Sequence, residues 1–176
     1  MTPNVLDTVG SFYSTSFAEP DWEAVYTEQL PRVYNFLRYR LGNETLAQDL
    51  TSRTFEKAWC ERQRYRRDIA KFSTWLLQIA RNVVVDYYRT RHEHAPLEAA
   101  SEVPAEGTPE EEAVIRSNFQ RLSLLTRQLT DRERELLALK YGAGATNRAI
   151  SEVTGLSESN VGTILHRAIQ ILRDKW

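Results

Sequence analysis

Arginines and aromatic rings are concentrated between residues 71 and 91, in the stretch KFSTWLLQIARNVVVDYYRTR. Arg81, Arg89 and Arg91 supply positive charge, and aromatic residues stand near both ends of the stretch. Arginines bind phosphates, and flat rings stack on unpaired bases. These residue types, gathered in one short stretch, indicate the capture of a nucleic-acid strand.

Apolar spacing places this stretch on a helix with one buried face. The apolar residues recur at i, i+3, i+4 and i+7, namely Phe72, Trp75, Leu76, Ile79, Ala80, Val83, Val84 and Tyr87. An ordinary core helix with solvated arginines shows the same pattern, because amphipathic helices are common in globular proteins. Both interpretations stay open on this stretch alone.

Length and composition favour one or two small all-helical domains. The chain has 176 residues, 41% of them hydrophobic, with only 7 Gly and 6 Pro. Residues 53–91 hold ten Lys and Arg against four Asp and Glu, and residues 115–176 hold ten against six. Residues 95–112 hold six Glu and no Lys or Arg. A net charge of −1 therefore hides a basic half, an acidic connector and a mildly basic half.

The composition also argues against several classes of protein. Cys60 is the only cysteine, which excludes an intramolecular disulfide and a cysteine metal cluster. His92, His94 and His166 have no metal-binding spacing, and no phosphate loop or nucleophile elbow is present, so we expect no enzyme, metal or cofactor. No signal peptide is recognisable, and no apolar run approaches the roughly 20 residues of a membrane span. We expect a soluble cytoplasmic protein.

Three helices are predicted in the first half of the chain, after a mobile tail at residues 1–20. Asp21 caps the first helix, which continues to Leu41 as one helix kinked at Pro31. The second helix is expected from about 44 to 62 and the third from 71 to 91. The loop between them, ERQRYRRDIAK, is strongly basic and holds one tyrosine. Its charge favours a nucleic-acid contact over a plain solvated turn.

A second helical unit is predicted after an extended acidic linker at 95–112. Its first helix has a stripe of Ile115, Phe119, Leu122, Leu125 and Leu129. Thr130 and Glu133 form a capping box for the next helix. That helix is expected to bury Leu136, Leu137 and Tyr141 and to end at residues 142–144, where two glycines occur.

The segment from 149 to 165 has the pattern of a helix-turn-helix. Ser151 allows close helix crossing, Gly155 allows a sharp turn, and Ser157 caps the second helix. Leu156, Val161 and Ile164 or Leu165 are expected to be buried. The second helix would then expose Glu158, Ser159, Asn160, Thr163, His166 and Arg167. Asn160 suits adenine and Arg167 suits guanine or a phosphate. A plain helical hairpin is the alternative.

Three motifs in this order resemble a known family. AQDLTSRTFEKAW resembles the core-polymerase-binding helix of bacterial RNA polymerase sigma factors of the extracytoplasmic function (ECF) class. FSTWLLQIARNVVVDYYR resembles the promoter-melting helix that reads the minus-ten element. LTDRERELLALKY and the helix-turn-helix up to VGTILHRA resemble the domain that reads the minus-thirty-five element. The resemblance extends from about residue 21 to residue 172.

The resemblance implies an all-α protein with a region 2 bundle at 21–94, an acidic linker at 95–112 and a region 4 helix-turn-helix bundle at 113–176. It implies that a polymerase-binding surface is formed, or supported from behind, by Asp49, Leu50, Arg53, Phe55 and Trp59. It implies capture of single-stranded minus-ten DNA by Arg64, Arg66, Arg67, Lys71, Trp75, Arg81, Asn82, Asp86 and Arg89. It implies minus-thirty-five contacts by Arg148, Ser157, Ser159, Asn160, Thr163, His166 and Arg167.

The partners that the resemblance implies are core RNA polymerase, through its β′ clamp helices and β flap, and promoter DNA. The acidic linker would pass through the RNA exit path, unless it is a plain tether. If an anti-sigma factor exists for this chain, we expect it to cover the polymerase-binding faces of both domains. No membrane contact is implied.

Two departures from the family pattern affect these expectations. Ser52 and Arg53 replace a frequent Gln-Glu pair, so we expect the polymerase contact to differ in detail from the family pattern. Gly162 and Ile164 replace frequent cations of the recognition helix, so we predict weak autonomous binding to minus-thirty-five DNA. A stand-alone helix-turn-helix regulator is the alternative function, although it gives no reason for the basic, aromatic third helix.

Overall fold

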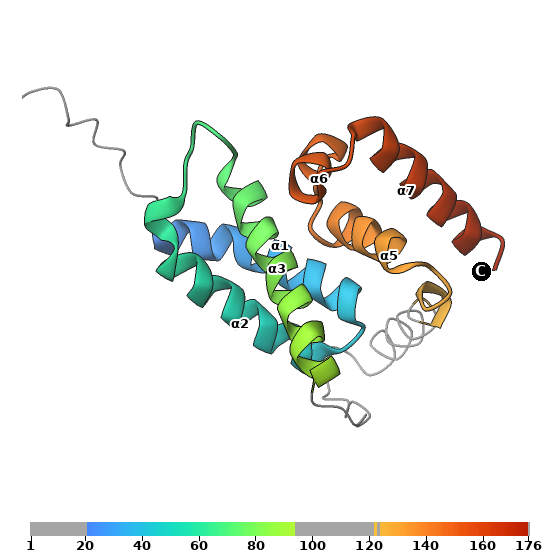
Figure 1. Cartoon of the computed structure of the whole chain (residues 1–176), viewed down its shortest axis with the longest axis horizontal. Coiled ribbons are helices and arrows are strands. Elements are labelled where there is room, and N and C mark those ends of the chain that lie inside the picture. Colours follow the sequence, from blue (N-terminus) through green and yellow to red (C-terminus); the bar gives the residue numbers. More distant parts are fainter. Residues whose placement is uncertain (1–20, 94–121, 123, 176) are drawn as a thin grey trace, which may run out of the picture.

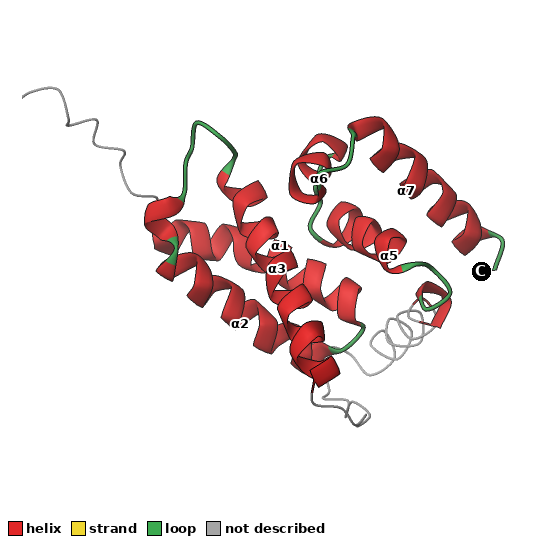
Figure 2. Ribbon diagram, viewed as in Figure 1, coloured by secondary structure: helices red, strands yellow, loops and turns green. Residues whose placement is uncertain are grey.

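The computed structural model describes residues 21–93, 122 and 124–175, and all regular structure in these ranges is helical (Figure 2). The helices of the first half are α1 (Trp22–Leu41), α2 (Glu44–Cys60), the 3-10 turn η2 (Arg62–Arg64) and α3 (Phe72–Glu93). Those of the second half are α5 (Asp131–Leu137), the π-helical turn η3 (Ala138–Gly142), α6 (Asn147–Thr154) and α7 (Glu158–Arg173). The predictions for residues 1–20 and for the linker at 95–112 lie outside the described residues, as do Ile115 and Phe119.

Local capping signals set the ends of the first helices. The Asp21 carboxylate accepts hydrogen bonds from the backbone N–H groups of Glu23 and Ala24 and so starts α1. Helix α1 continues through Pro31 and ends at Gly42, which has a φ of 68°. The prediction of one continuous helix across the proline is confirmed. Helix α2 ends at Cys60, slightly before the expected residue 62.

The second half begins with the capping box that the sequence predicts. The Thr130 hydroxyl accepts from the Glu133 backbone N–H, and the Glu133 carboxylate accepts from the Thr130 backbone N–H at 2.8 Å. The prediction that Tyr141 is buried is wrong, because its side chain is 56% exposed. The π turn adds a residue to the helical repeat and so shifts the face on which Tyr141 emerges.

The two halves share one hydrophobic core. Phe36 of α1, Leu76 of α3 and Leu139 of η3 belong to the same cluster of buried side chains, and each is at most 1% exposed. In Figure 1, α5 and α6 lie beside α1 and α3, while α7 lies on the side away from them. Two helical units were predicted, and the structure adds that they pack directly against each other. No helix among the described residues is long and apolar enough to cross a membrane.

Candidate nucleic-acid interface

One stripe of polar and exposed residues runs along α3. Gln78, Asn82, Val85 and Arg89 are exposed, and the half-exposed Asp86 lies among them at helical spacing. The Asp86 carboxylate lies 3.2 Å from Arg89 and 3.6 Å from Lys57 of α2. The predicted face of Asn82 and Asp86 is therefore present, with the Asp86 charge balanced by two cations. Sequence reasoning did not identify Gln78 and Val85, although their spacing from Asn82 was the available signal.

The Arg81 side chain lies outside this stripe and contacts the second half of the chain. Its Nε donates to Glu135 Oε1 at 2.8 Å, and the two side chains are 27% and 11% exposed. Glu135 also accepts from Arg132 at 3.2 Å. Consecutive helical residues point about 100° apart, so Arg81 and Asn82 face different surroundings. The structure does not place Arg81 with the other candidate strand-binding residues.

Trp75 is half-buried in an aromatic cluster at the start of α3. Its ring centroid lies 5.2 Å from that of Tyr65 and 5.3 Å from that of Phe72. Phe72 in turn lies 5.6 Å from Trp22, which packs edge-on against Trp59 at 5.3 Å. Such ring pairs stabilise packing beyond the area that they bury. Trp75 therefore anchors the basic loop through Tyr65 and presents only part of its surface to a ligand.

The loop before α3 presents its cations to solvent. Arg64, Arg66, Arg67 and Lys71 are exposed. Arg66 forms a bidentate pair with Asp68, at 2.7 and 3.2 Å, and this hydrogen bonding lowers the pKa of the Asp68 carboxyl. At least three exposed cations thus precede α3 and are available to a phosphate backbone.

Ile69 is a loop residue that sequence reasoning did not single out. Its side chain is 71% exposed, between the cations of the loop and the start of α3. An apolar side chain in this position can contact an unstacked base or insert between bases. A lone β-branched residue inside a run of arginines was the available signal. The loop geometry around it is fixed by the Tyr65 hydroxyl, which donates to the Ala70 carbonyl at 3.2 Å.

The predicted helix-turn-helix is present, although Leu156, which was expected to be buried, is only partly buried. Gly155 has a φ of 74°, and the Ser151 hydroxyl donates to the Leu156 carbonyl across the turn at 2.5 Å. Val161 and Leu165 are buried, and Ile164 packs partly against the core. Ser157 accepts the Asn160 backbone N–H at 3.2 Å, so its hydroxyl caps α7.

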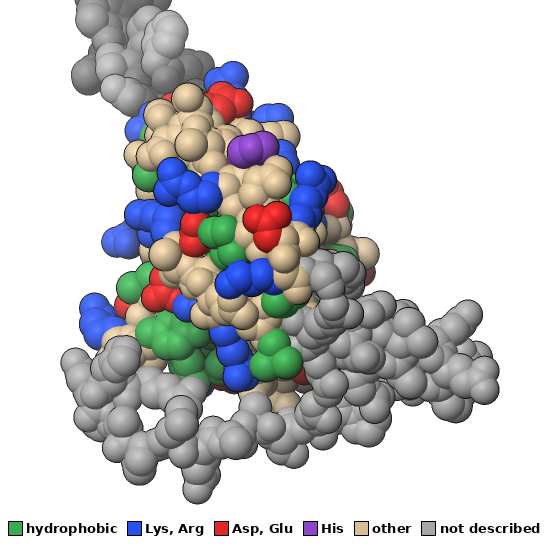
Figure 3. Space-filling view, turned by 90° about the vertical axis from the view of Figure 1, so that its right-hand side faces the viewer, with side chains coloured by type: hydrophobic (Ala, Val, Ile, Leu, Met, Phe, Trp, Pro, Cys, Tyr) green, Lys and Arg blue, Asp and Glu red, His purple; other side chains and the backbone are tan. Residues whose placement is uncertain are grey.

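The outer face of α7 is open in the structure. Ser159, Asn160, Thr163, His166 and Arg167 are exposed there. Arg148 is exposed on α6, with its Nε 3.5 Å from Glu152. Figure 3, which views the molecule from the side of α7, shows Lys and Arg interspersed with acidic side chains and with neutral polar surface. Dispersed charge of this kind favours modest binding to duplex DNA.

The predicted polymerase-binding residues of α2 divide into two groups. Asp49, Arg53 and Trp59 are exposed, and Asp49 pairs with Arg53 at 3.1 Å. Leu50 and Phe55 are 0% and 9% exposed, so they support the helix from inside. The Arg62 guanidinium lies over the Trp59 ring, 4.2 Å from its centroid, and extends this outer surface with a cation.

Two family models match the chain in the order that these surfaces suggest. The Sigma-70 region 2 model matches residues 25–93, which hold α1, α2 and α3. The Sigma-70 region 4 model matches residues 119–172, which hold the helix-turn-helix.

Curated relatives agree with both matches. The ECF RNA polymerase sigma factor SigW of Bacillus subtilis is 30% identical over 156 residues, covering 81% of this chain and 81% of SigW. SigM of the same species is 28% identical, covering 86% of this chain and 92% of SigM. BldN of Streptomyces coelicolor is 28% identical over 84% of this chain, which spans 57% of the length of BldN.

Solved structures share the fold. The sigma factor RpoE of Bartonella quintana, in complex with the anti-sigma factor NepR, superposes with a TM-score of 0.68 at 19% identity, over 88% of this chain and 95% of RpoE. CnrH, in complex with the cytosolic domain of CnrY, gives 0.60 at 22% identity, over 87% and 83%. The two region matches and the similarity to SigW show that this chain belongs to the ECF class of RNA polymerase sigma factors, which direct RNA polymerase to promoters.

Proposed function

We propose that the α3 stripe and the basic loop before it capture the minus-ten element as a single strand. The observation that carries this proposal is that α3 bears the exposed residues Gln78, Asn82, Val85 and Arg89, and that the loop leading into the same helix bears the exposed cations Arg64, Arg66, Arg67 and Lys71. The amide of Asn82 offers a donor and an acceptor to a base edge. The loop cations bind the backbone beside it. Arg81 joins this surface only after it leaves Glu135.

The same proposal assigns the other two exposed faces. The outer face of α2, with Asp49, Arg53 and Trp59, docks to the β′ clamp helices of core polymerase. The region 4 unit binds the β flap and presents α7 to minus-thirty-five DNA. This assignment replaces the alternative of a stand-alone regulator, and it requires the protein to work in the cytoplasm with the polymerase.

An anti-sigma factor is a further proposed partner. RpoE and CnrH, which share this fold, were each solved in complex with a second protein, NepR and CnrY. We propose that an anti-sigma factor of this chain would cover the exposed face of α2, including the half-exposed Trp59.

Site-specific photo-crosslinking tests the strand-capture proposal. A photoreactive amino acid at Val85, which is 51% exposed within the stripe, is expected to crosslink promoter DNA when core polymerase is present. The same group at Glu28, which is exposed on α1, serves as the matched control and is expected to give no DNA adduct. Equal crosslinking from both positions, or none from Val85 in an active complex, would contradict the proposal.

A further inference from the structure

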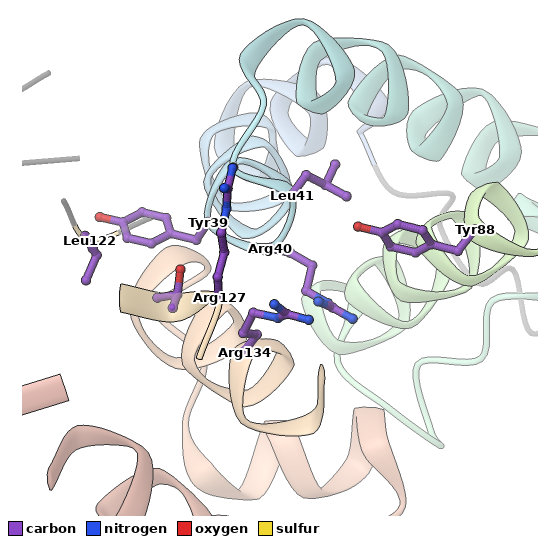
Figure 4. Close-up of a pocket in the computed structure, with 9 residues that line it drawn as sticks. Tyr39, Arg40, Leu41, Tyr88, Leu122, Arg127 and Arg134 are labelled. Carbon is purple, nitrogen blue, oxygen red and sulfur yellow. The ribbon is translucent and has the colours of Figure 1, made fainter. Parts of the chain in front are cut away.

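A cavity of about 230 Å³ lies where the end of α1, the end of α3 and the segment leading into α5 meet. Three of the described residues that line it are arginines, Arg40, Arg127 and Arg134, and none of them is Asp or Glu. Figure 4 shows the side chains of Arg40 and Arg134 reaching this space from α1 and α5. These arginines lie outside the α3 stripe, the basic loop, α7 and the outer face of α2. A hollow lined by cations alone favours an anionic ligand.

Arg40 is a nearly buried cation whose hydrogen-bonding capacity is not used by the residues around it. Its side chain is 11% exposed, and its Nη1 atom lies 3.6 Å from the Asp131 carboxylate, which is 77% exposed. That separation is longer than a hydrogen bond. A guanidinium has five N–H donors, and donors that are buried without acceptors lower the stability of the fold. Arg40 therefore has donors that a ligand in the cavity can satisfy.

Arg134 repeats this feature from the side of α5. Its Nη2 atom donates to the Asp131 carboxylate, but its Nε–H is buried and has no hydrogen-bond acceptor among the described residues. Arg127, the third arginine, is exposed to solvent. Asp131 is thus shared by Arg40 and Arg134, and three guanidinium charges against this one carboxylate charge leave an excess of two positive charges.

Charge and size favour a phosphate group on a small compound. A phosphate dianion matches the excess of two positive charges, and its oxygens accept the paired N–H groups of guanidinium forks. Pockets for drug-sized ligands have about 300–1,000 Å³, whereas this cavity has about 230 Å³. In Figure 4 the hydroxyl end of Tyr88 is directed from α3 toward the same space, where it can donate to a further oxygen.

DNA is a poor occupant of this cavity. A nucleic-acid backbone is contacted by side chains at the protein surface, whereas the Arg40 and Arg134 side chains are only 11% and 27% exposed. We propose that the cavity binds a phosphate group, either free or carried by a small monoester. Arg40 and Arg134 hold the phosphate, and Arg127 adds positive charge from the solvent side. This site is independent of the strand-capture role proposed for α3.

Isothermal titration calorimetry of the full-length chain tests the site, with inorganic phosphate and glycerol 3-phosphate as ligands at one ionic strength held by sodium chloride. We expect saturable binding at a single site for at least one of the two. Tighter binding of glycerol 3-phosphate would identify a phosphorylated compound as the ligand, and equal or weaker binding would identify inorganic phosphate. The absence of saturable binding for both ligands would overturn the proposal. Displacement of the bound phosphate by a short single-stranded DNA would also overturn it, because the arginines would then serve nucleic acid.

Three variants locate the binding. Arg40→Gln should weaken phosphate binding about tenfold, because it removes charge-assisted hydrogen bonds in a nearly buried place. Arg127→Gln changes an exposed residue and decides the question if Arg40→Gln does not fold; its smaller loss of affinity should vanish at high salt. Arg53→Gln is the matched control, since it removes an exposed cation from α2, which contributes no lining residue. Wild-type affinity in the folded cavity variants, or an equal loss in Arg53→Gln, would overturn the site.

Discussion

Arg81 and Asn82 are neighbours in the sequence, but their side chains serve different surfaces. Asn82 is exposed on the outer stripe of α3, whereas Arg81 donates to Glu135 at 2.8 Å where region 2 contacts region 4. One helix thus carries a candidate base-binding face and, about 100° away, a face that contacts region 4. Substitutions at the two positions should therefore have separable effects.

Asn82→Ala should abolish promoter opening more completely than Arg167→Ala. Asn82 offers hydrogen bonds to a captured base, whereas Arg167 stands on a recognition helix that lacks two frequent cations. Permanganate reactivity of unpaired thymines in the minus-ten element measures opening directly. Glu28→Gln, an exposed change on α1, controls for general effects. A variant pair with the reverse order would overturn this ranking.

Gly162→Lys should strengthen holoenzyme binding to promoters through the minus-thirty-five element. The Cβ position at Gly162 has room, since only the Asn147 amide lies within van der Waals contact. One added phosphate contact should steepen the dependence of log K on log salt concentration by about one. Mobility shifts over a salt series give that slope. Gly162→Gln, which adds length without charge, should leave it unchanged, and equal slopes for both variants would refute the phosphate contact.

Leu50→Ala and Trp59→Ala should impair polymerase binding for different reasons. Leu50 is fully buried, so its truncation should lower the free energy of unfolding by roughly 2–5 kcal/mol. Trp59 is 49% exposed and should lose polymerase affinity with a smaller loss of stability. Chemical denaturation and co-elution with core polymerase separate the two effects. Unimpaired co-elution of Trp59→Ala would exclude its ring from the interface.

Asp131 should make stability depend on pH in the acid range. Its hydrogen bond from Arg134, with Arg40 nearby, lowers the pKa of this carboxyl below its ordinary value. The resulting stabilisation is present above the unfolded-state pKa of about 3.9 and is lost as pH falls through the folded-state pKa. Wild type should therefore exceed Asp131→Asn in melting temperature at pH 6, and the difference should shrink at pH 3. A difference that is constant with pH would show that the charge contributes nothing.

Local signals in the sequence were sufficient to predict most of the helix ends. Asp21, Thr130 and Ser157 cap their helices as expected, because an N-cap depends only on the next three residues. The contact of Arg81 with Glu135 joins residues 54 positions apart, and no local pattern announces it. The expectation that Tyr141 is buried is wrong because no local pattern indicates the π turn that displaces it.

Two glycines show the same difference between local signals, which the sequence reveals, and long-range contacts, which it does not. The turn at Gly155 was predicted, since a helix-turn-helix needs a positive φ there. The expected helix end at residues 142–144 is confirmed, since η3 ends at Gly142 and Gly144 has a positive φ of 63°. The sequence does not show that Gly142 also admits the backbone of α1. A close approach between distant segments depends on tertiary packing, which the sequence around a glycine does not specify.

Transcription by a reconstituted holoenzyme tests the central claim most directly. The full-length chain is added to core RNA polymerase on a library of promoter fragments, and run-off transcripts are sequenced. The account predicts specific transcripts whose upstream DNA shares a minus-ten and a minus-thirty-five element, obtained only when both chain and core are present. The absence of transcripts, together with no co-elution of the chain with core polymerase, would contradict it.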